Sequence, residues 1–190
     1  DVRSSTSTEA KIRIGRAAAG LLPESGLVFL DAGTTTAMLA SAIAEDPGQV
    51  GEGLSFLTNC LPIAVNLAAA GIKRVELLGG RIRPNTQAVI GDTTLRSLAV
   101  QHAEVAFIGT NALSLEHGLS TTDAQEAAVK RAMIANAGLK VAMCDSTKFG
   151  RDYLVSFAGA DELDIVITDQ GAPDRYLEAC NENGISVISA

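Results

Sequence analysis

The fold of this chain is decided by the stretch Val28-Phe29-Leu30-Asp31-Ala32-Gly33-Thr34-Thr35-Thr36. Its first three residues are apolar and predict a buried strand, and an alanine- and leucine-rich segment, residues 37–44, predicts a helix after the Asp31-Ala32-Gly33 corner. At such a corner the first N–H groups of the helix are free to meet an anion. Gly33 would let a ligand approach the backbone, and the three threonines add hydroxyl donors. The alternative is that Thr34 or Thr35 simply caps the helix.

The same order of strand, polar corner and helix recurs along the chain. Apolar runs predict strands at residues 28–30, 54–57, 75–78, 87–90, 105–108, 141–144, 165–168 and 185–188. Helical patterns cover residues 9–22, 37–44, 63–70, 92–100, 123–136 and 174–183. Strands that alternate with helices indicate an α/β fold, with a mostly parallel sheet and helices on both faces. Residues 118–122 are predicted to be a loop.

Composition indicates one globular domain over residues 1–190. The chain is 47% hydrophobic and 19% charged, which suits a single α/β domain and argues against disorder. No apolar run approaches the roughly 18 residues of a membrane span, so we expect a cytoplasmic protein without membrane contact. The 3 cysteines are odd in number and widely spaced, which predicts neither a disulfide framework nor a metal site. The chain starts without methionine, so we expect a piece of a longer protein.

The charge of the chain limits its partners. The net charge is −7, the wrong sign for a surface that binds nucleic acid through counterion release. Aromatic residues are only 4% of the sequence, so stacking platforms for single-stranded bases are not expected either. The chain by itself is therefore predicted not to bind DNA.

Polar residues follow the predicted strands. Ligands of open parallel sheets lie outside the carboxyl ends of the strands, so a common edge would gather these residues. Hydroxyls, amides, one arginine and one lysine suit a sugar that carries a phosphate. Gly80 and Arg81 could equally be a glycine turn beside a solvated arginine, and Cys60 could touch the ligand or be a small packed residue. The polar candidates at this edge are Thr34, Thr35, Thr36, Thr58, Asn59, Gly80, Arg81, Asn111 and Lys148.

The helix after residue 122 begins with a recognisable signal. Asp123 and Glu126 fit a capping box, in which each residue satisfies a backbone N–H of the other. Glu126 and Lys130 are four residues apart, so they fall on one helix face and can pair. Local helix chemistry accounts for all three residues without a ligand.

In their order and spacing, several segments make this chain resemble the effector-binding domain of the DeoR family of bacterial transcriptional repressors. These segments are Phe29-Leu30-Asp31-Ala32-Gly33-Thr34-Thr35, Leu57-Thr58-Asn59, Leu78-Gly79-Gly80, Phe107-Ile108-Gly109, Gly118-Leu119-Ser120-Thr121-Thr122-Asp123, Glu126-Ala127-Ala128-Val129-Lys130 and Cys144-Asp145-Ser146-Thr147-Lys148-Phe149-Gly150. The resemblance implies a phosphorylated sugar or related metabolite as effector. It also implies a helix-turn-helix module that precedes residue 1, through which alone the protein would contact DNA, and a fold similar to that of ribose 5-phosphate isomerase. On the same grounds residues 31–36, with Asp31 and Gly33, would line the effector site, and Asp123, Glu126, Lys130 and Lys148 would complete it.

An enzyme is the alternative, because the related isomerases transfer protons with carboxylates and a lysine. Where that family has an acidic Asp-Gly-Ala-Asp-Glu segment, this chain has Ile108-Gly109-Thr110-Asn111-Ala112, without a carboxylate. We therefore predict no catalytic residue, cofactor or metal, and keep a sugar-phosphate isomerase or deaminase as the second hypothesis. A third, a bare assembly domain, would leave the polar strand ends unexplained. Because helix-turn-helix repressors read paired half-sites, we also expect a homodimer or homotetramer.

Overall fold

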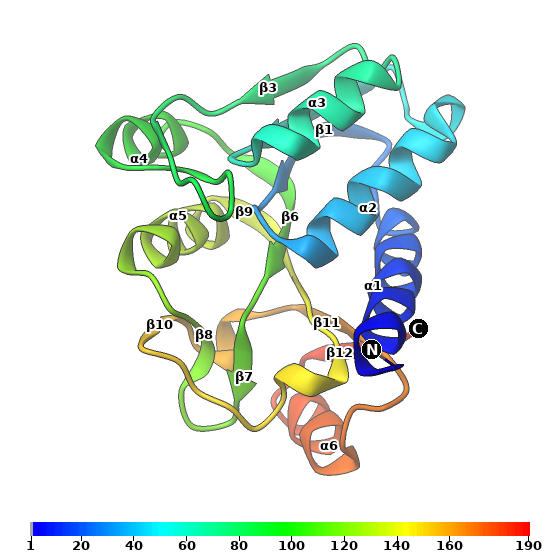
Figure 1. Ribbon diagram of the computed structural model, residues 1–190, viewed down its shortest axis with the longest axis vertical. Helices are drawn as coiled ribbons and strands as arrows, with labels where there is room; N and C mark the ends of the chain where they lie inside the picture. Colours follow the sequence, from blue (N-terminus) through cyan, green and yellow to red (C-terminus); the bar gives the residue numbers. More distant parts are fainter. Residues whose placement is uncertain (1) are drawn as a thin grey trace.

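The described residues form a main sheet of seven strands in the order β12-β11-β9-β6-β1-β2-β3. Figure 1 shows this sheet crossing the molecule from β3 at the top to β12 near the bottom. This computed structural model describes residues 2–190, so Asp1 of the predicted domain lies outside the described residues. Every neighbouring pair in this sheet is parallel. The strands are β1 (Ser25–Leu30), β2 (Gly53–Thr58), β3 (Val75–Leu77), β6 (Ala103–Gly109), β9 (Ala137–Met143), β11 (Ile165–Thr168) and β12 (Ser186–Ser189).

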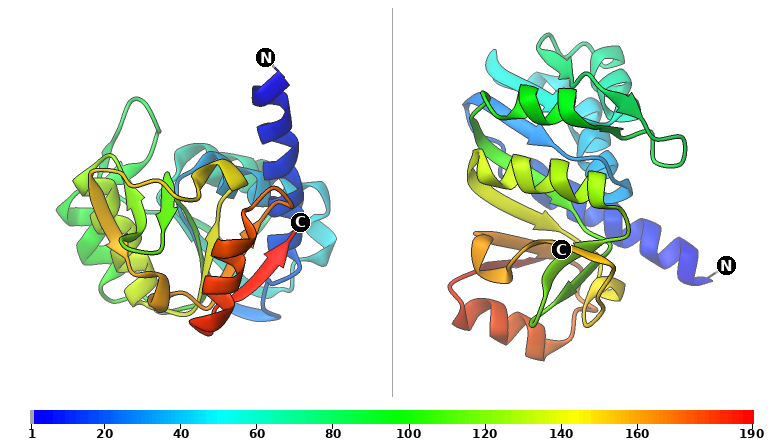
Figure 2. Two further views of the ribbon diagram at one scale, coloured as in Figure 1. Left: turned by 90° about the horizontal axis from the view of Figure 1, so that it is seen from below. Right: turned by 90° about the vertical axis from the view of Figure 1, so that its left-hand side faces the viewer.

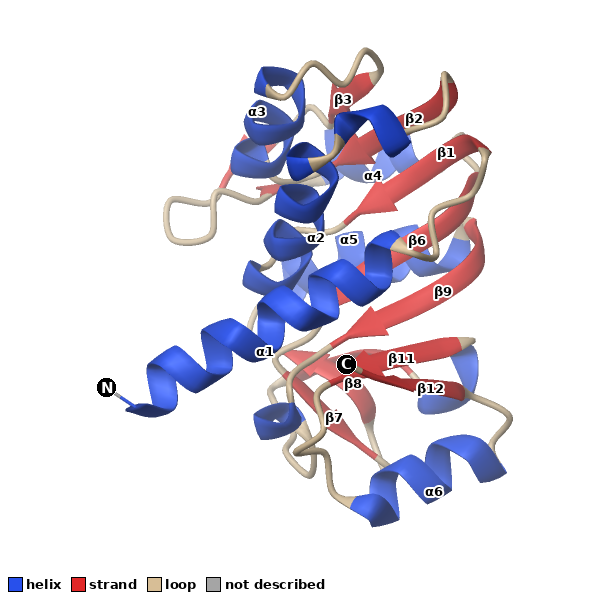
Figure 3. Ribbon diagram, turned by 90° about the vertical axis from the view of Figure 1, so that its right-hand side faces the viewer, coloured by secondary structure: helices blue, strands red, loops and turns tan. Residues whose placement is uncertain are grey.

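Helices cover both faces of the sheet. One face carries α1 (Val2–Ala19), α2 (Thr34–Glu45) and α3 (Leu61–Ala69), which lie in front of the strands in Figure 3. The opposite face, turned to the viewer in the right panel of Figure 2, carries α4 (Asp92–Leu98), α5 (Ala124–Ala135) and α6 (Asp174–Glu182). The predicted α/β architecture is confirmed. None of the described helices combines the length and the apolar character needed to cross a membrane.

The core consists of two apolar clusters, one on each side of the sheet. In β1, Val28 and Leu30 belong to the cluster that includes residues of α1, α2 and α3, whereas Phe29 belongs to the cluster that includes residues of α4, α5 and α6. Successive side chains of a strand point to opposite faces, so a strand covered on both sides reads as an unbroken apolar run. Each of these fully buried side chains contributes about 1.5–3 kcal/mol through burial.

Two smaller antiparallel sheets lie beside the large one. One joins β7 (Ala112–Ser114), β8 (Gly118–Thr121) and β10 (Val155–Ala158), and the other is the hairpin of β4 (Arg81–Ile82) and β5 (Val89–Ile90). The prediction of a loop at residues 118–122 is therefore wrong. The residues of β8 are glycine, leucine, serine and threonine, which show no apolar periodicity, and the strand forms because β7 and β10 pair with it on both sides.

The first helix differs from its prediction at both ends. It was expected over residues 9–22 with Thr8 as its N-cap, but α1 runs from Val2 to Ala19, so Thr8 lies inside it. The amino-terminal half of α1 projects beyond the rest of the molecule in Figures 2 and 3. Three short 3-10 turns complete the structure: η1 (Pro47–Gln49), η2 (Ser146–Lys148) and η3 (Ala160–Glu162).

Candidate functional site

The corner between β1 and α2 leaves the start of the helix open. Gly33 is the N-cap residue of α2, and no side chain forms a cap hydrogen bond there. The Thr36 hydroxyl donates instead to the carbonyls of Asp31 (2.7 Å) and Gly33 (2.9 Å). Among the described residues none accepts a hydrogen bond from the N–H groups of Thr34, Thr35 or Thr36. The alternative that Thr34 or Thr35 caps the helix is therefore wrong, and of the three residues with these N–H groups Thr34 is exposed while Thr35 and Thr36 are buried.

A buried ion pair lies directly behind this corner. The Lys130 ammonium on α5 donates to the Asp31 carboxylate and to the Gly109 carbonyl (2.9 Å), and the Gly109 N–H donates to the same carboxylate (3.1 Å). Burial raises the pKa of Asp31, and the charge and hydrogen bond of Lys130 oppose that rise. Lys130 also lies 5.5 Å from the centroid of the Phe157 ring. The sequence offered Glu126 as the partner of Lys130, but the partner in the structure is Asp31, because the buried ammonium requires a buried anion.

The end of β2 is tied to the β1 corner by polar side chains. The Thr58 hydroxyl donates to the Leu30 carbonyl (2.6 Å), and the Asn59 side-chain oxygen accepts from the Ala32 N–H (2.9 Å). Burial raises the pKa of the Cys60 thiol, although the backbone N–H groups of Ile63 and Gly33 act in the opposite direction. Thr58 and Asn59 thus hold the corner in shape, and Cys60 is a packed neighbour of it.

The hairpin of β4 and β5 folds back towards α5. Arg81 is exposed and donates to the side chain of Gln125, while Arg83 pairs with Glu126 and lies 3.4 Å from the Asp123 carboxylate. Gly80, which precedes the hairpin, has φ +151°, so it serves the turn by adopting a backbone conformation that other residues rarely adopt. Arg83 was not predicted, because it follows no strand core and only the folded hairpin brings it to the site.

The first turn of α5 supplies two carboxylates. Asp123 accepts from the N–H groups of Gln125 (3.0 Å) and Glu126 (2.9 Å), which confirms it as an N-cap. The reciprocal half of the predicted capping box is absent, because the Glu126 carboxylate accepts from Arg83 and from the Thr86 hydroxyl (2.7 Å). Asn111, at the end of β6, is exposed and accepts from the Thr121 hydroxyl (2.8 Å).

Lys148 stands at the other side of this edge, on the turn η2 after β9. Its side chain is half-buried, and it forms no hydrogen bond or ion pair with the described residues. Asp169, after β11, accepts from the Ser146 N–H (2.6 Å), and one oxygen of the buried Asp145 carboxylate has no hydrogen-bond partner among the described residues. Neither aspartate was predicted as a site residue. Asp145 could have been found from its position directly after the predicted strand at residues 141–144.

The sheet order brings most of the predicted residues to one edge. The corners after β2, β1, β6 and β9 are consecutive along this edge, and adjacent strands are about 4.8 Å apart. Gly80 and Arg81 follow β3, the outermost strand, and reach the site only because the hairpin turns back onto α5. Over residues 2–190 there is no group of three or more His, Cys, Asp or Glu side chains that could hold a metal ion.

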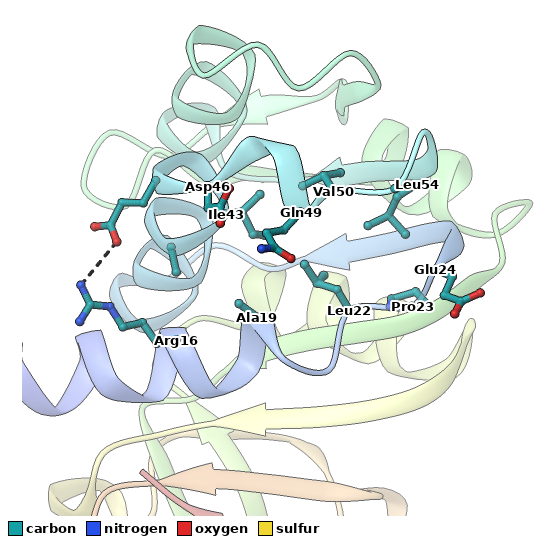
Figure 4. Close-up of a pocket in the computed structure, with 13 residues that line it drawn as sticks. Arg16, Ala19, Leu22, Pro23, Glu24, Ile43, Asp46, Gln49, Val50 and Leu54 are labelled. Atoms are coloured by element: carbon teal, nitrogen blue, oxygen red, sulfur yellow. Dashed lines mark hydrogen bonds and ion pairs between the residues drawn. The ribbon is translucent and has the colours of Figure 1, made fainter.

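A hollow of about 530 Å³ lies at the opposite ends of β1 and β2 and is separate from this site. Figure 4 shows it between the end of α1, the end of α2 and the segment that follows. Apolar side chains such as Leu22, Ile43 and Val50 line it, and the Arg16 and Glu45 ion pair (3.4 Å) crosses its rim. None of the predicted site residues contributes to it.

Comparisons with known proteins agree with the fold and identify relatives. The chain matches the family model described as the DeoR C terminal sensor domain over residues 6–170. It is 34% identical over 180 residues to the HTH-type transcriptional regulator GlpR of Haloferax volcanii, an alignment that covers 95% of this chain and 68% of the relative. It is 29% identical over 185 residues to the glycerol-3-phosphate regulon repressor of Escherichia coli K12, covering 97% of this chain and 71% of the relative.

A solved structure shows the same architecture. The ribose 5-phosphate isomerase of Plasmodium falciparum superposes with a TM-score of 0.54 at 12% sequence identity, over 75% of this chain and 53% of the isomerase chain. At this identity the likeness concerns the fold alone. The predicted similarity to the ribose 5-phosphate isomerase fold is confirmed.

Proposed function

Because this chain belongs to the family of DeoR C-terminal sensor domains, we propose that it binds a phosphorylated sugar or polyol at the carboxyl edge of its large sheet. The family consists of sensor domains of transcriptional regulators, and the chain is a sensor rather than an enzyme. The effector would be recognised and released unchanged.

The open start of α2 is the observation that carries the proposal. Three consecutive N–H groups that have no acceptor within the described part of the chain, at the positive end of a helix, favour an oxyanion. The exposed Thr34 hydroxyl lies at the same place and can add a donor. The half-buried ammonium of Lys148 has no anionic partner among the described residues and can meet the charge of a phosphate.

The remaining candidates suit the hydroxyl groups of a sugar. Asn111 and Asp123 are oxygen-bearing side chains with part of their surface exposed, and both follow strands of the same region. Asp31 and Lys130 are bound to each other and almost completely buried, so we assign them to shaping the site rather than to direct contact. Lys130 is only 4% exposed and already holds two acceptors, which makes it a poor proton carrier.

The partners of the domain follow from the same reasoning. With a net charge of −7, the domain would influence DNA only through another module of the full protein. We propose that it self-associates as a dimer or tetramer, so that two such modules face paired half-sites. Sedimentation at micromolar concentration would reveal the oligomer, and a monomer throughout would contradict this part of the proposal.

Calorimetry with matched pairs of ligands tests the proposal. Glycerol 3-phosphate, fructose 1-phosphate and fructose 6-phosphate are compared with glycerol and fructose, and NMR follows whether each ligand stays unaltered. We expect at least one phosphorylated compound to bind, and Lys148→Met to weaken it about ten- to a hundredfold. Lys73→Met is the control, because Lys73 is exposed and lies near Glu52, away from the site. Equal binding of phosphorylated and unphosphorylated partners would contradict the proposal.

A further inference from the structure

The hairpin of β4 and β5 presents two guanidinium groups to the first turn of α5. Arg81 lies in β4, Arg83 follows the strand directly, and both side chains reach residues of the same helical turn. Arg81 donates to the neutral side chain of Gln125, whereas Arg83 pairs with the carboxylates of Glu126 and Asp123. The hairpin therefore brings two positive charges to the first turn of α5.

Glu126 is the anion that occupies this pair of arginines. One carboxylate oxygen accepts from both the Arg83 guanidinium and the Thr86 hydroxyl. The Glu126 side chain is 12% exposed and that of Arg83 is 23% exposed, so the contact is shielded without being sealed from water. The charge of Glu126 also acts on Asp31, whose pKa it helps to raise. Glu126 thus stands between the hairpin and the corner after β1.

The root of the hairpin is tied to the β2 corner, whereas most of its outer part is exposed. The Val89 N–H donates to the Asn59 carbonyl (2.6 Å), and the Asn59 side chain donates to the Val89 carbonyl (3.3 Å). Ala88 forms a further bridge with Cys60. In contrast, Arg81 and residues 84–87 are exposed. The arginines can therefore change partners without the hairpin leaving the β2 corner.

We propose that Arg83, assisted by Arg81 and Thr86, binds the phosphate of the effector, and that Glu126 occupies this site until the effector arrives. The proposal rests on the function proposed above and adds a residue to it. A guanidinium fork accepts carboxylate and phosphate in the same geometry, so one can replace the other. A phosphate carries nearly two negative charges against one for Glu126, and the N–H groups of α2 hold it as well. The released Glu126 then lies one helical turn from Lys130.

The direction in which Glu126→Gln changes the affinity for phosphate distinguishes a competing Glu126 from one that binds the sugar. If Glu126 competes with the phosphate, Glu126→Gln removes both the competitor and a like charge, and an anion binds more tightly. If Glu126 instead accepts sugar hydroxyls, the same change weakens binding. Glutamine keeps the size and one oxygen of the side chain, so the hairpin contact can persist in the folded domain.

Inorganic phosphate and glycerol 3-phosphate are the probes, with affinities measured by calorimetry or NMR titration and folding checked by thermal unfolding. We expect Glu126→Gln to tighten phosphate binding about tenfold and Arg83→Gln to weaken it about tenfold, the range of a hydrogen bond to a charged group. Arg74→Gln is the matched control, because Arg74 is an exposed arginine before β3, at the opposite edge.

Two results would overturn the inference and leave the proposed function standing. In the first, Arg83→Gln binds glycerol 3-phosphate as tightly as the parent does. In the second, Glu126→Gln binds the probes less tightly than the parent or with the same affinity. A different result would contradict the proposed function itself: no phosphorylated compound binds the parent, and Lys148→Met does not change the measured binding. A domain in which neither the parent nor Glu126→Gln binds phosphate also overturns the inference.

Discussion

The ammonium of Lys130 donates to the carboxylate of Asp31, although 99 residues separate the two in the sequence. Gly109 closes the arrangement, since its N–H donates to Asp31 and its carbonyl accepts from Lys130. These three hydrogen bonds therefore join the β1 corner, the end of β6 and helix α5. They fix the relative position of the elements that carry the proposed effector site.

Breaking this pair should destabilise the domain strongly. Asp31→Asn leaves a buried ammonium without its anion, and Lys130→Met leaves a buried carboxylate without its cation. Each change should lower the free energy of unfolding by about 3–5 kcal/mol. The double variant should lose clearly less than the sum of the two, because neither uncompensated charge remains. Urea unfolding of the four proteins measures this, and additive losses would show that the pair is not coupled.

Thr36 should matter for stability where Thr34 does not. The Thr36 hydroxyl is fully buried and donates to the Asp31 carbonyl (2.7 Å), so Thr36→Val should cost about 1–3 kcal/mol. Thr34 is exposed and its hydroxyl has no partner among the described residues, so Thr34→Val should change stability by less than about 0.5 kcal/mol. Thermal unfolding without ligand compares them. Equal losses would mean that the Thr36 hydroxyl does not hold the corner.

Two neighbouring glycines provide another matched pair. Gly80 has φ +151°, and a Cβ there would lie 2.3 Å from the Thr94 hydroxyl and 2.7 Å from the Ile90 carbonyl. Gly80→Ala should therefore destabilise the hairpin by about 1–3 kcal/mol. A Cβ on Gly79 would meet nothing closer than 3.9 Å, so Gly79→Ala should be nearly neutral. If both variants melt like the parent, the hairpin root is less constrained than the structure indicates.

Asp169 should contribute to stability at neutral pH and lose that contribution in acid. Burial favours a higher pKa for this carboxyl, but the Ser146 and Gly171 N–H groups outweigh it, and the net pKa lies below the ordinary 3.8. A pKa that is lower in the folded state gives stability above the unfolded value, and this stability disappears as the pH falls through the folded value. The stability lost in Asp169→Asn should thus be largest at neutral pH and shrink below pH 3.8. A loss that is independent of pH would contradict this assignment.

The sequence predicts an element or a site residue where the local pattern decides its structure, and fails where partners from distant segments decide it. The strands of the large sheet were predictable because both faces are buried, which gives unbroken apolar runs such as Val28–Leu30. Strand β8 was missed because its pairing partners, not its own pattern, make it a strand. The spacing of Glu126 and Lys130 permits a pair between them. In the structure Glu126 pairs with Arg83 and Lys130 pairs with Asp31, and both partners come from distant parts of the chain. Arg83 could be identified as a site residue only from the structure, because the folded hairpin brings it to Glu126.

The central claim is that the start of α2 holds the phosphate of the effector, and amide chemical shifts test it most directly. A phosphorylated compound that binds is titrated into the isotopically labelled domain. We predict that the amide signals of Thr34, Thr35 and Thr36 move most, because their N–H groups have no acceptor among the described residues. Signals that stay fixed at these three residues, while those around Leu22, Ile43 and Val50 in the opposite hollow move, would contradict the claim.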